Sequence, residues 1–206
     1  MTNPRPDPVG INFAPGPPIA RADAVRNRER LICSAREIVR TEGAAALTME
    51  RLAQHAGVGK GTVFRRFGSR SGLMFALLDE AEKEIQHGYL FGPPPLGPGA
   101  PPLDRLLAYG EARLRFLLEH GDLQLQAERE PFESFRAPPR IVEHTHVTNL
   151  LTEAQVTIDP RLLAYSLLSC LATPNVLYQH HSQGISLDDL VAAWEYLVIR
   201  SVAPGR

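Results

Sequence analysis

The chain has 206 residues, 44% of them hydrophobic and 22% charged, with a formal net charge of −1 at pH 7. This length suffices for one substantial core, or for a small domain beside a larger one. The sequence has no apolar run of about eighteen residues and no basic-then-apolar start, so we expect a cytoplasmic protein without a membrane span or secretory signal. The two cysteines, Cys33 and Cys170, lack CxxC spacing, which favours free thiols over a disulfide or a zinc site.

The small net charge conceals an uneven distribution along the chain. Residues 21–70 carry 11 Lys or Arg against 5 Asp or Glu, whereas residues 71–206 carry 10 against 17. A basic segment attracts nucleic acid through release of the counterions around its phosphates, and an acidic remainder keeps the other end away. The pattern therefore favours a polyanionic partner at one end of the molecule only.

The first part of the chain divides into an arm and a helix. Residues 1–20 contain six prolines and few apolar residues, which predicts a disordered arm. A helix is expected over residues 24–42, and Gly43 would end it. The apolar face of this helix consists of Leu31, Ile32, Ala35, Ile38 and Val39.

Residues 47–78 have the order of elements that a helix-turn-helix needs. Thr48 is a candidate N-cap for a helix over residues 48–56, and Gly57 can adopt the left-handed conformation that turns the chain. A second helix is expected over residues 59–64, with Val58, Val63 and Phe67 burying its back. The residues left on its outer side are Lys60, Gly61, Thr62, Phe64, Arg65 and Arg66. Small residues on an exposed helix face let the helix enter a DNA groove, which a merely solvated basic surface would not require.

Helices are also expected in the rest of the chain. After Ser69 a helix should reach about Tyr89, and residues 92–102 must form a loop because they include six prolines. Further helices are expected over residues 103–119, 122–128, 139–153, 160–181 and 187–202. No segment alternates with period two for long enough to predict a strand, so the expected fold class is all-α.

Residues 24–78 resemble the DNA-binding domain of the TetR family of bacterial transcriptional repressors. The resemblance rests on GVGKGTVFRRF at residues 57–67, on Thr48, and on the Ser69-Arg70 step. It implies a three-helix DNA-binding domain, here residues 21–70, in a homodimer that binds a pseudo-palindromic operator in double-stranded DNA. The positions expected to contact DNA are Thr48, Lys60, Gly61, Thr62, Phe64, Arg65, Arg66 and Arg70. The family usually has tyrosine at the position of Phe64, so a phenolic phosphate contact is replaced by an apolar one.

The resemblance also implies that residues 71–206 form a ligand-binding and dimerisation domain. Its last two helices would join the partner chain, and their sequences suit this role: apolar residues recur at three-and-four spacing over residues 187–198, and residues 162–171 are apolar almost all round. The residues expected at the interface are Leu167, Leu171, Leu187, Leu190, Trp194 and Leu197. A core packed wholly within one chain is the alternative.

Polar and aromatic residues on these apolar helices are candidates for a ligand pocket. They are Arg113, Phe116, His146, Asn149, Tyr165 and Tyr178. No basic cluster is present for a phosphorylated metabolite, so the expected inducer is a mainly apolar small molecule with one or two polar groups. Pro174 should kink the helix over residues 160–181 and open space beside it.

Catalytic and metal-binding patterns are absent from the sequence. It contains no glycine-rich phosphate loop, no GxSxG and no HExxH, so we expect no catalytic residues, no cofactor and no metal. A metal site assembled across helices from His120, His144 and His180 remains an alternative, as does a helical enzyme with an incidental helix-turn-helix. An activator, or a repressor without a ligand, also fits the sequence.

Overall fold

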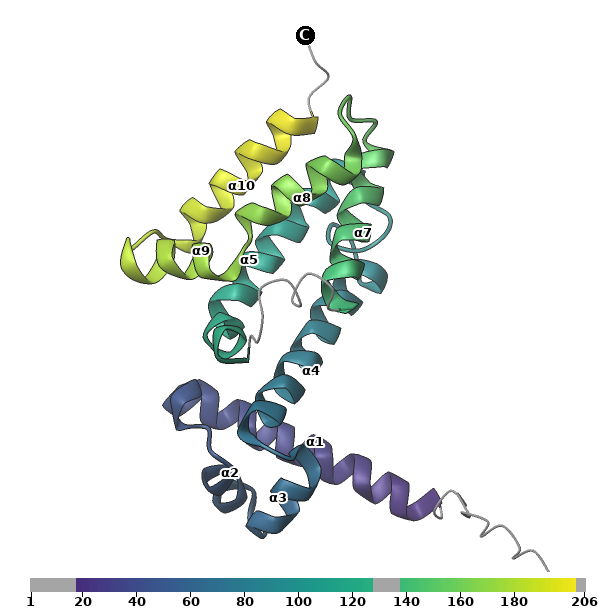
Figure 1. Ribbon diagram of the computed structural model, residues 1–206. Helices are drawn as coiled ribbons and strands as arrows, with labels where there is room; N and C mark the ends of the chain where they lie inside the picture. Colours follow the sequence, from purple (N-terminus) through teal and green to yellow (C-terminus); the bar gives the residue numbers. More distant parts are fainter. Residues whose placement is uncertain (1–17, 128–137, 203–206) are drawn as a thin grey trace, which may run out of the picture.

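The computed structural model describes residues 18–127 and 138–202 (Figure 1). Every regular element in these two ranges is helical, and none of them is a β-strand, so the all-α prediction is confirmed. Within the same ranges, no helix is both long and apolar enough to cross a membrane. The helices form a smaller N-terminal part and a larger C-terminal part, and one long helix runs between the two (Figure 1).

The N-terminal part consists of α1 (Pro18–Glu42), the short 3-10 turn η1 (Ala44–Ala46), α2 (Met49–Ala56) and α3 (Lys60–Phe67). Helix α1 begins six residues before the predicted start at Ala24, because proline is well tolerated in the first turn of a helix. The predicted disordered arm therefore overlaps this helix at residues 18–20, and its residues 1–17 lie outside the described part of the chain.

A first core lies beneath α1, α2 and α3. It buries Leu31 and Ile38 from α1, Leu52 from α2 and Val63 from α3, each at most 1% exposed. The predicted apolar face of α1 is confirmed, with Val39 only partly buried at its edge. The next helix, α4 (Arg70–Phe91), begins at the cap residue Ser69, whose side chain accepts a hydrogen bond from the Gly72 amide.

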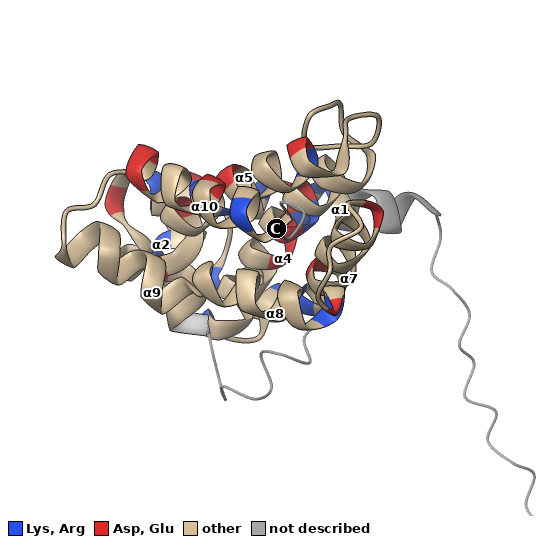
Figure 2. Ribbon diagram, turned by 90° about the horizontal axis from the view of Figure 1, so that it is seen from above, with Lys and Arg blue, Asp and Glu red and all other residues tan. Residues whose placement is uncertain are grey.

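The C-terminal part consists of α5, α7, α8, α9, the single π-helical turn η2 and α10. Their bounds are Pro102–Ala127 (α5), Pro138–Glu153 (α7), Pro160–Cys170 (α8), Thr173–Leu177 (α9), Tyr178–Ser182 (η2) and Leu187–Val202 (α10). The proline-rich loop separates α4 from α5, as predicted. Acidic positions lie along α5 and α10 on this part of the molecule (Figure 2).

Two expectations about helix ends in this part are wrong. Residues 103–119 and 122–128 belong to one helix, α5, because Gly121 makes room for a neighbour and does not end the helix. A Cβ atom at residue 121 would lie 2.9 Å from Leu177 Cδ1. The helix expected over residues 160–181 is divided at Leu171 and Ala172, and Pro174 lies in the first turn of α9. The chain therefore breaks before the proline and is not kinked at it.

A second core surrounds α5, with α4, α7, α9 and α10 packed against it and α8 packed mainly against α7. Helix α10 approaches α5 closely at Gly110, where a Cβ atom would lie 1.9 Å from Trp194 Nε1. The indole of Trp194 donates a hydrogen bond of 3.1 Å to the Leu106 carbonyl of α5, which satisfies its buried N–H. Glycine at residue 110 thus allows the tryptophan to fill the space between the two helices.

Candidate nucleic-acid interface

Helices α2 and α3 form a helix-turn-helix with caps at each boundary. The Thr48 hydroxyl accepts a hydrogen bond of 3.0 Å from the Arg51 amide, which confirms Thr48 as the N-cap of α2. Gly57 ends α2 in the left-handed conformation, with φ 65° and ψ 36°, and Gly59 precedes the first residue of α3. Because few residues other than glycine adopt a positive φ readily, Gly57 fixes the turn between the helices.

Helix α3 has one buried face and one exposed face, as predicted. Val63 is fully buried, and Val58 and Phe67 pack partly buried beside it. The exposed residues are Lys60, Gly61, Phe64, Arg65 and Arg66, whereas Thr62 is half-buried. The exposed face is therefore basic, with Phe64 as its largest apolar group.

The packing of the chain does not explain glycine at residue 61. A Cβ atom there would meet no atom within 4 Å, other than those of the neighbouring helix backbone. Glycine within a helix carries an entropic cost of roughly 0.5–1 kcal/mol relative to alanine. The smallest residue thus lies on the exposed face of the helix, and packing inside the molecule does not require it there.

Lys60 is held in place by Glu50, which the sequence pattern did not single out. Its ammonium group forms an ion pair with Glu50 of α2 and lies 5.5 Å from the centroid of the Phe64 ring. The hydrogen bond from Lys60 lowers the pKa of the Glu50 carboxyl, so Glu50 is ionised at neutral pH. A phosphate or a base that approaches Lys60 would compete with this carboxylate for its ammonium group.

Arg70, a predicted DNA contact, bonds to the chain itself. Its guanidinium donates to the Leu47 carbonyl at 2.7 Å and to the Ala44 carbonyl at 3.0 Å, which ties the start of α4 to the segment before α2. These contacts give Arg70 a role in positioning the helix-turn-helix, and its contact with DNA stays a prediction. Thr48 differs, since its hydroxyl uses only an acceptor site in the cap and keeps its hydrogen for donation.

Known proteins match this part of the chain. Residues 31–77 match the family described as "Bacterial regulatory proteins, tetR family". An HTH-type transcriptional regulator of Staphylococcus aureus is 36% identical over 58 residues, which cover 28% of this chain and 31% of that protein. The N-terminal domain is that of the tetR family. The chain spans about a third of the length of this curated relative, so the match concerns the tetR-family domain alone.

Solved structures of bacterial regulators share the fold over most of the chain. A TetR-family transcriptional regulator from Rhodococcus sp. has a TM-score of 0.63 at 17% identity, covering 87% of this chain and all of its own. NalD, the secondary repressor of the MexAB-OprM multidrug efflux pump in Pseudomonas aeruginosa, has a TM-score of 0.58 at 14% identity. That alignment covers 87% of this chain and 97% of NalD. These likenesses show that the C-terminal helices, as well as the N-terminal ones, have the same fold as the solved structures.

The predicted ligand-binding residues separate into two groups. Arg113, Phe116 and His146 are buried, whereas Asn149 is exposed and the side chains of Tyr165 and Tyr178 are 56% and 58% exposed. The latter three therefore do not wall a pocket inside the C-terminal core of this chain. Helical periodicity predicts which face of its helix each residue occupies, but not which neighbouring element covers that face.

The buried group contains a charged network. Arg113 donates to Glu82 of α4 at 2.9 Å and lies 3.2 Å from Glu143 of α7, which also accepts hydrogen bonds from Tyr109 and Arg140. Burial opposes the ionisation of Glu143, but the two arginines outweigh it and lower the pKa of its carboxyl. Arg113 is therefore already compensated by two carboxylates.

His146 lies beside this network without a hydrogen bond to its Nε2 from the described residues. Its ring packs 4.4 Å from that of Tyr89, and burial, with a smaller contribution from Arg105, lowers its pKa to about 4. The imidazole is therefore neutral at pH 7. Two predicted pocket residues, Arg113 and His146, have a buried nitrogen without a hydrogen bond from the described residues, but Nε of Arg113 lies in an ion pair with Glu143, whereas Nε2 of His146 has no charged partner among them.

Most of the predicted interface residues belong to the core of their own chain. Leu167, Leu171, Leu190 and Trp194 are at most 6% exposed within the second core, and Leu187 packs partly buried against it. Only Leu197 is exposed, at 40%. This corrects the expectation for the buried residues, because the apolar stripe of α10 packs on α5 of the same chain.

The three histidines considered for a metal site lie apart in the fold. His144 Nε2 lies 3.1 Å from the Arg161 carbonyl and His180 Nδ1 lies 2.8 Å from the Ile185 carbonyl, while His120 lies beside Glu119. Among the described residues, no three His, Cys, Asp or Glu side chains gather as metal ligands would. Cys33 and Cys170 are free and exposed.

Proposed function

We propose that this protein is a DNA-binding transcriptional repressor that recognises a pseudo-palindromic operator as a homodimer and releases it on binding a small molecule. The observation that carries the proposal is the exposed face of α3, in which Gly61 opens the helix surface beside Arg65 and Arg66. A helix with this shape fits the major groove, where its first turn reaches the bases and its arginines reach the phosphates.

The proposed dimer joins the outer faces of α8 and α10. Large apolar side chains are exposed on both helices, with Leu162 61% exposed on α8 and Tyr196 and Ile199 62% and 48% exposed on α10. Exposed apolar residues that gather on neighbouring helices are typical of an interface between chains. Leu197, which was expected at the interface from the sequence, lies on the same helix and stays in this proposal.

The proposed inducer site lies in the second core near His146, Phe116 and Arg113. His146 supplies one unpaired polar nitrogen, while the Phe116 ring, 4.6 Å from the Arg113 guanidinium carbon, adds apolar area. A mainly apolar ligand with one hydrogen-bonding group suits these walls. Because Arg113 already has two carboxylate partners, an anionic ligand has little to gain from it.

Selection of bound fragments from random genomic DNA tests the DNA-binding part of the proposal. Wild-type protein should enrich a two-fold symmetric sequence, and its affinity should fall steeply with salt. Replacing both Arg65 and Arg66 by Ala should weaken binding to selected and random DNA alike, because phosphate contacts carry no sequence information. Failure to enrich any sequence, or unchanged affinity of the double variant, would refute it.

A reporter gene controlled by the enriched sequence distinguishes a repressor from an activator. Expression should fall when the protein is present and rise again when a compound releases the operator. Because linkage is reciprocal, operator DNA should lower the affinity for that compound by the same factor. A rise in expression without any compound would make the protein an activator instead.

A further inference from the structure

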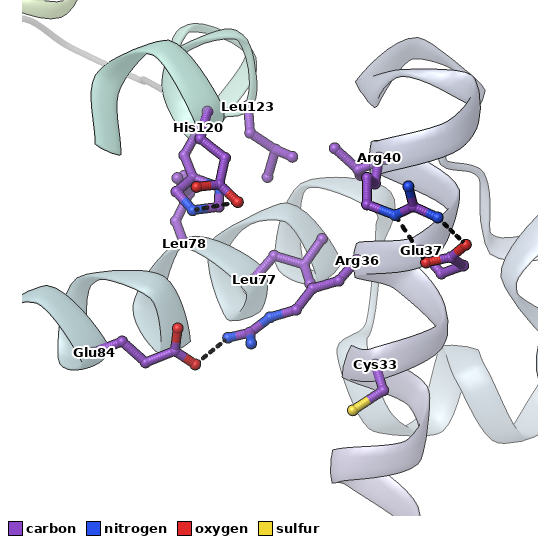
Figure 3. A pocket seen from close by; sticks show the side chains of 11 residues that line it. Cys33, Arg36, Glu37, Arg40, Leu77, Leu78, Glu84, His120 and Leu123 are labelled. Atoms are coloured by element: carbon purple, nitrogen blue, oxygen red, sulfur yellow. Dashed lines mark hydrogen bonds and ion pairs between the residues drawn. The ribbon is translucent and has the colours of Figure 1, made fainter. Parts of the chain in front are cut away.

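A pocket of about 540 Å³ lies where α1, α4 and the end of α5 meet (Figure 3). This volume falls within the range of roughly 300–1,000 Å³ that small-molecule sites occupy. The pocket is distinct from the second core, and none of the predicted ligand residues lines it. Its walls come from both parts of the molecule, because α1 belongs to the DNA-binding domain and α5 is the central helix of the C-terminal part.

The floor of the pocket is apolar. Leu77 of α4 and Leu123 of α5 are 5% and 4% exposed, and Leu78 lies half-buried beside them (Figure 3). Cys33 is exposed and lines the pocket from α1. An alkyl chain laid on this floor would remove apolar surface from water.

The rim carries more negative charge than positive charge. The rim contains three carboxylates and two guanidinium groups, which belong to Glu37, Glu84, Glu119, Arg36 and Arg40. Arg36 donates to Glu84 at 2.7 Å across the pocket, from α1 to α4, and Arg40 pairs with Glu37 on its own helix. Both arginines thus have carboxylate partners already, as the dashed lines in Figure 3 show.

Glu119 has a different environment from the other two carboxylates. Among the described residues its ion-pair contact is His120, whose Nε2 lies 3.8 Å away. Burial, opposed by Glu119 and assisted by Arg36, lowers the pKa of the His120 imidazole, so this ring is neutral at pH 7. A carboxylate beside a neutral imidazole offers acceptors to an N–H donor and lacks a positive charge of its own.

We propose that this pocket binds an amphiphilic primary amine, with its apolar chain on Leu77, Leu78 and Leu123 and its ammonium group at Glu119 and His120. A carboxylate ligand suits the rim less well, since it would lie among three glutamates and would have to displace Glu84 from Arg36. An occupant in this position contacts α4 and α5 and lies beside Cys33 and Arg36, which line the same pocket from α1. If the protein binds DNA as proposed above, the amine therefore favours one orientation of the DNA-binding domain.

The site can be tested without DNA by asking whether an alkylamine protects the Cys33 thiol from chemical modification. The chain contains only two cysteines, so Cys170→Ser leaves Cys33 as the sole thiol and Cys33→Ser leaves Cys170 as the matched control. Each variant is treated with methyl methanethiosulfonate, a neutral thiol reagent, and the rate of modification is followed by mass spectrometry. Octylamine should slow modification of Cys33 severalfold and leave Cys170 unchanged, while octanoate and octanol should protect Cys33 less.

A charge variant tests the contact to the ammonium group. Glu119→Gln in the Cys170→Ser background should raise the octylamine concentration needed for half-protection by about two- to fivefold, as expected for an exposed ion pair. Glu195→Gln, an exposed carboxylate on α10, should leave it unchanged. Equal protection by octanoate, equal protection of both cysteines, or no protection would overturn the proposal.

The link to DNA is measured separately. Octylamine at saturating concentration should change the affinity for the selected operator in wild type and less so in Glu119→Gln. Protection of Cys33 without any change in operator affinity would overturn the coupling between the pocket and DNA. Failure to bind any operator would instead refute the proposed function, and the thiol measurement would still decide whether the site exists.

Discussion

Replacing Gly61 by Ala should make the free protein slightly more stable and its complex with DNA weaker. Residue 61 is the second residue of α3, and an added Cβ atom would meet nothing within 4 Å. The substitution therefore introduces no clash and removes the entropic cost of glycine, which gives at most about 0.5–1 kcal/mol of added stability.

The same substitution should weaken DNA binding if α3 enters the groove at residue 61. A methyl group at a close approach to the DNA pushes the helix outward and loosens the contacts around it. A single well-formed base contact is worth about 1–3 kcal/mol, so losing one weakens operator affinity about tenfold or more. Gly61→Leu should weaken it further, because the added side chain is larger.

Urea denaturation and fluorescence anisotropy with labelled operator measure the two effects on the same samples. Higher stability together with weaker operator binding would show that glycine is kept for a surface outside the chain. Operator affinity equal to that of wild type for both Gly61→Ala and Gly61→Leu would refute the reasoning, since it would mean that DNA does not approach this side of α3.

Three further expectations follow from individual contacts. Glu50→Gln should free Lys60 and raise the affinity for random DNA severalfold at low salt but not at high salt, and unchanged anisotropy titrations would count against it. Leu197→Glu should yield a folded monomer, and a dimer in sedimentation at micromolar concentration would exclude α10 from the interface. The free energy of unfolding should fall as the pH drops from 6.5 to about 4. In this range His146 binds a proton in the unfolded chain but not in the folded protein, where its pKa is about 4. His146→Phe should flatten this dependence in thermal melts, and an identical slope would assign it to other groups.

The N-terminal helices were predictable because local signals specify them. Apolar spacing places Leu52 and Val63 inward, and Gly57 marks the turn, so the exposed face of α3 follows without knowledge of any distant residue. Arg70 was less predictable, because its sequence position reveals a positive charge but not the carbonyls of Ala44 and Leu47 that hold it.

The faces of the C-terminal helices depend on contacts between distant residues. A three-and-four stripe predicts that Leu190 and Trp194 are buried, but it does not say whether α5 or a partner chain covers them. Gly110, 84 residues before Trp194, decides this by letting the indole approach α5. The pocket beside Cys33 could not be predicted either, because its lining is assembled from three helices far apart in the sequence.

Helix α4 contributes buried residues to both cores and connects them as one uninterrupted helix. Leu73 and Met74 are buried in the first core, and Ala81 and Tyr89 are buried in the second. A continuous helix moves largely as one body, so a displacement of its second half carries over to its first residues, which follow the end of α3.

Charged residues connect α4 to α1 on one face and to α5 on the other. Glu80 and Glu84, four residues apart on one face, accept hydrogen bonds from arginines of α1, whereas Glu82, about 200° around the helix from each of them, accepts from Arg113 of α5. The ion pairs between α4 and α1 are partly exposed, so each contributes little to stability. The pair between Arg113 and Glu82 differs, because Arg113 is only 2% exposed and breaking a buried pair is costly. If a ligand in the second core shifts Arg113, as proposed above, we expect Glu82 to move with it and, through the opposite face of α4, also α1. The DNA-binding domain would then follow α4 as a unit, because α1 is held to that helix at both positions.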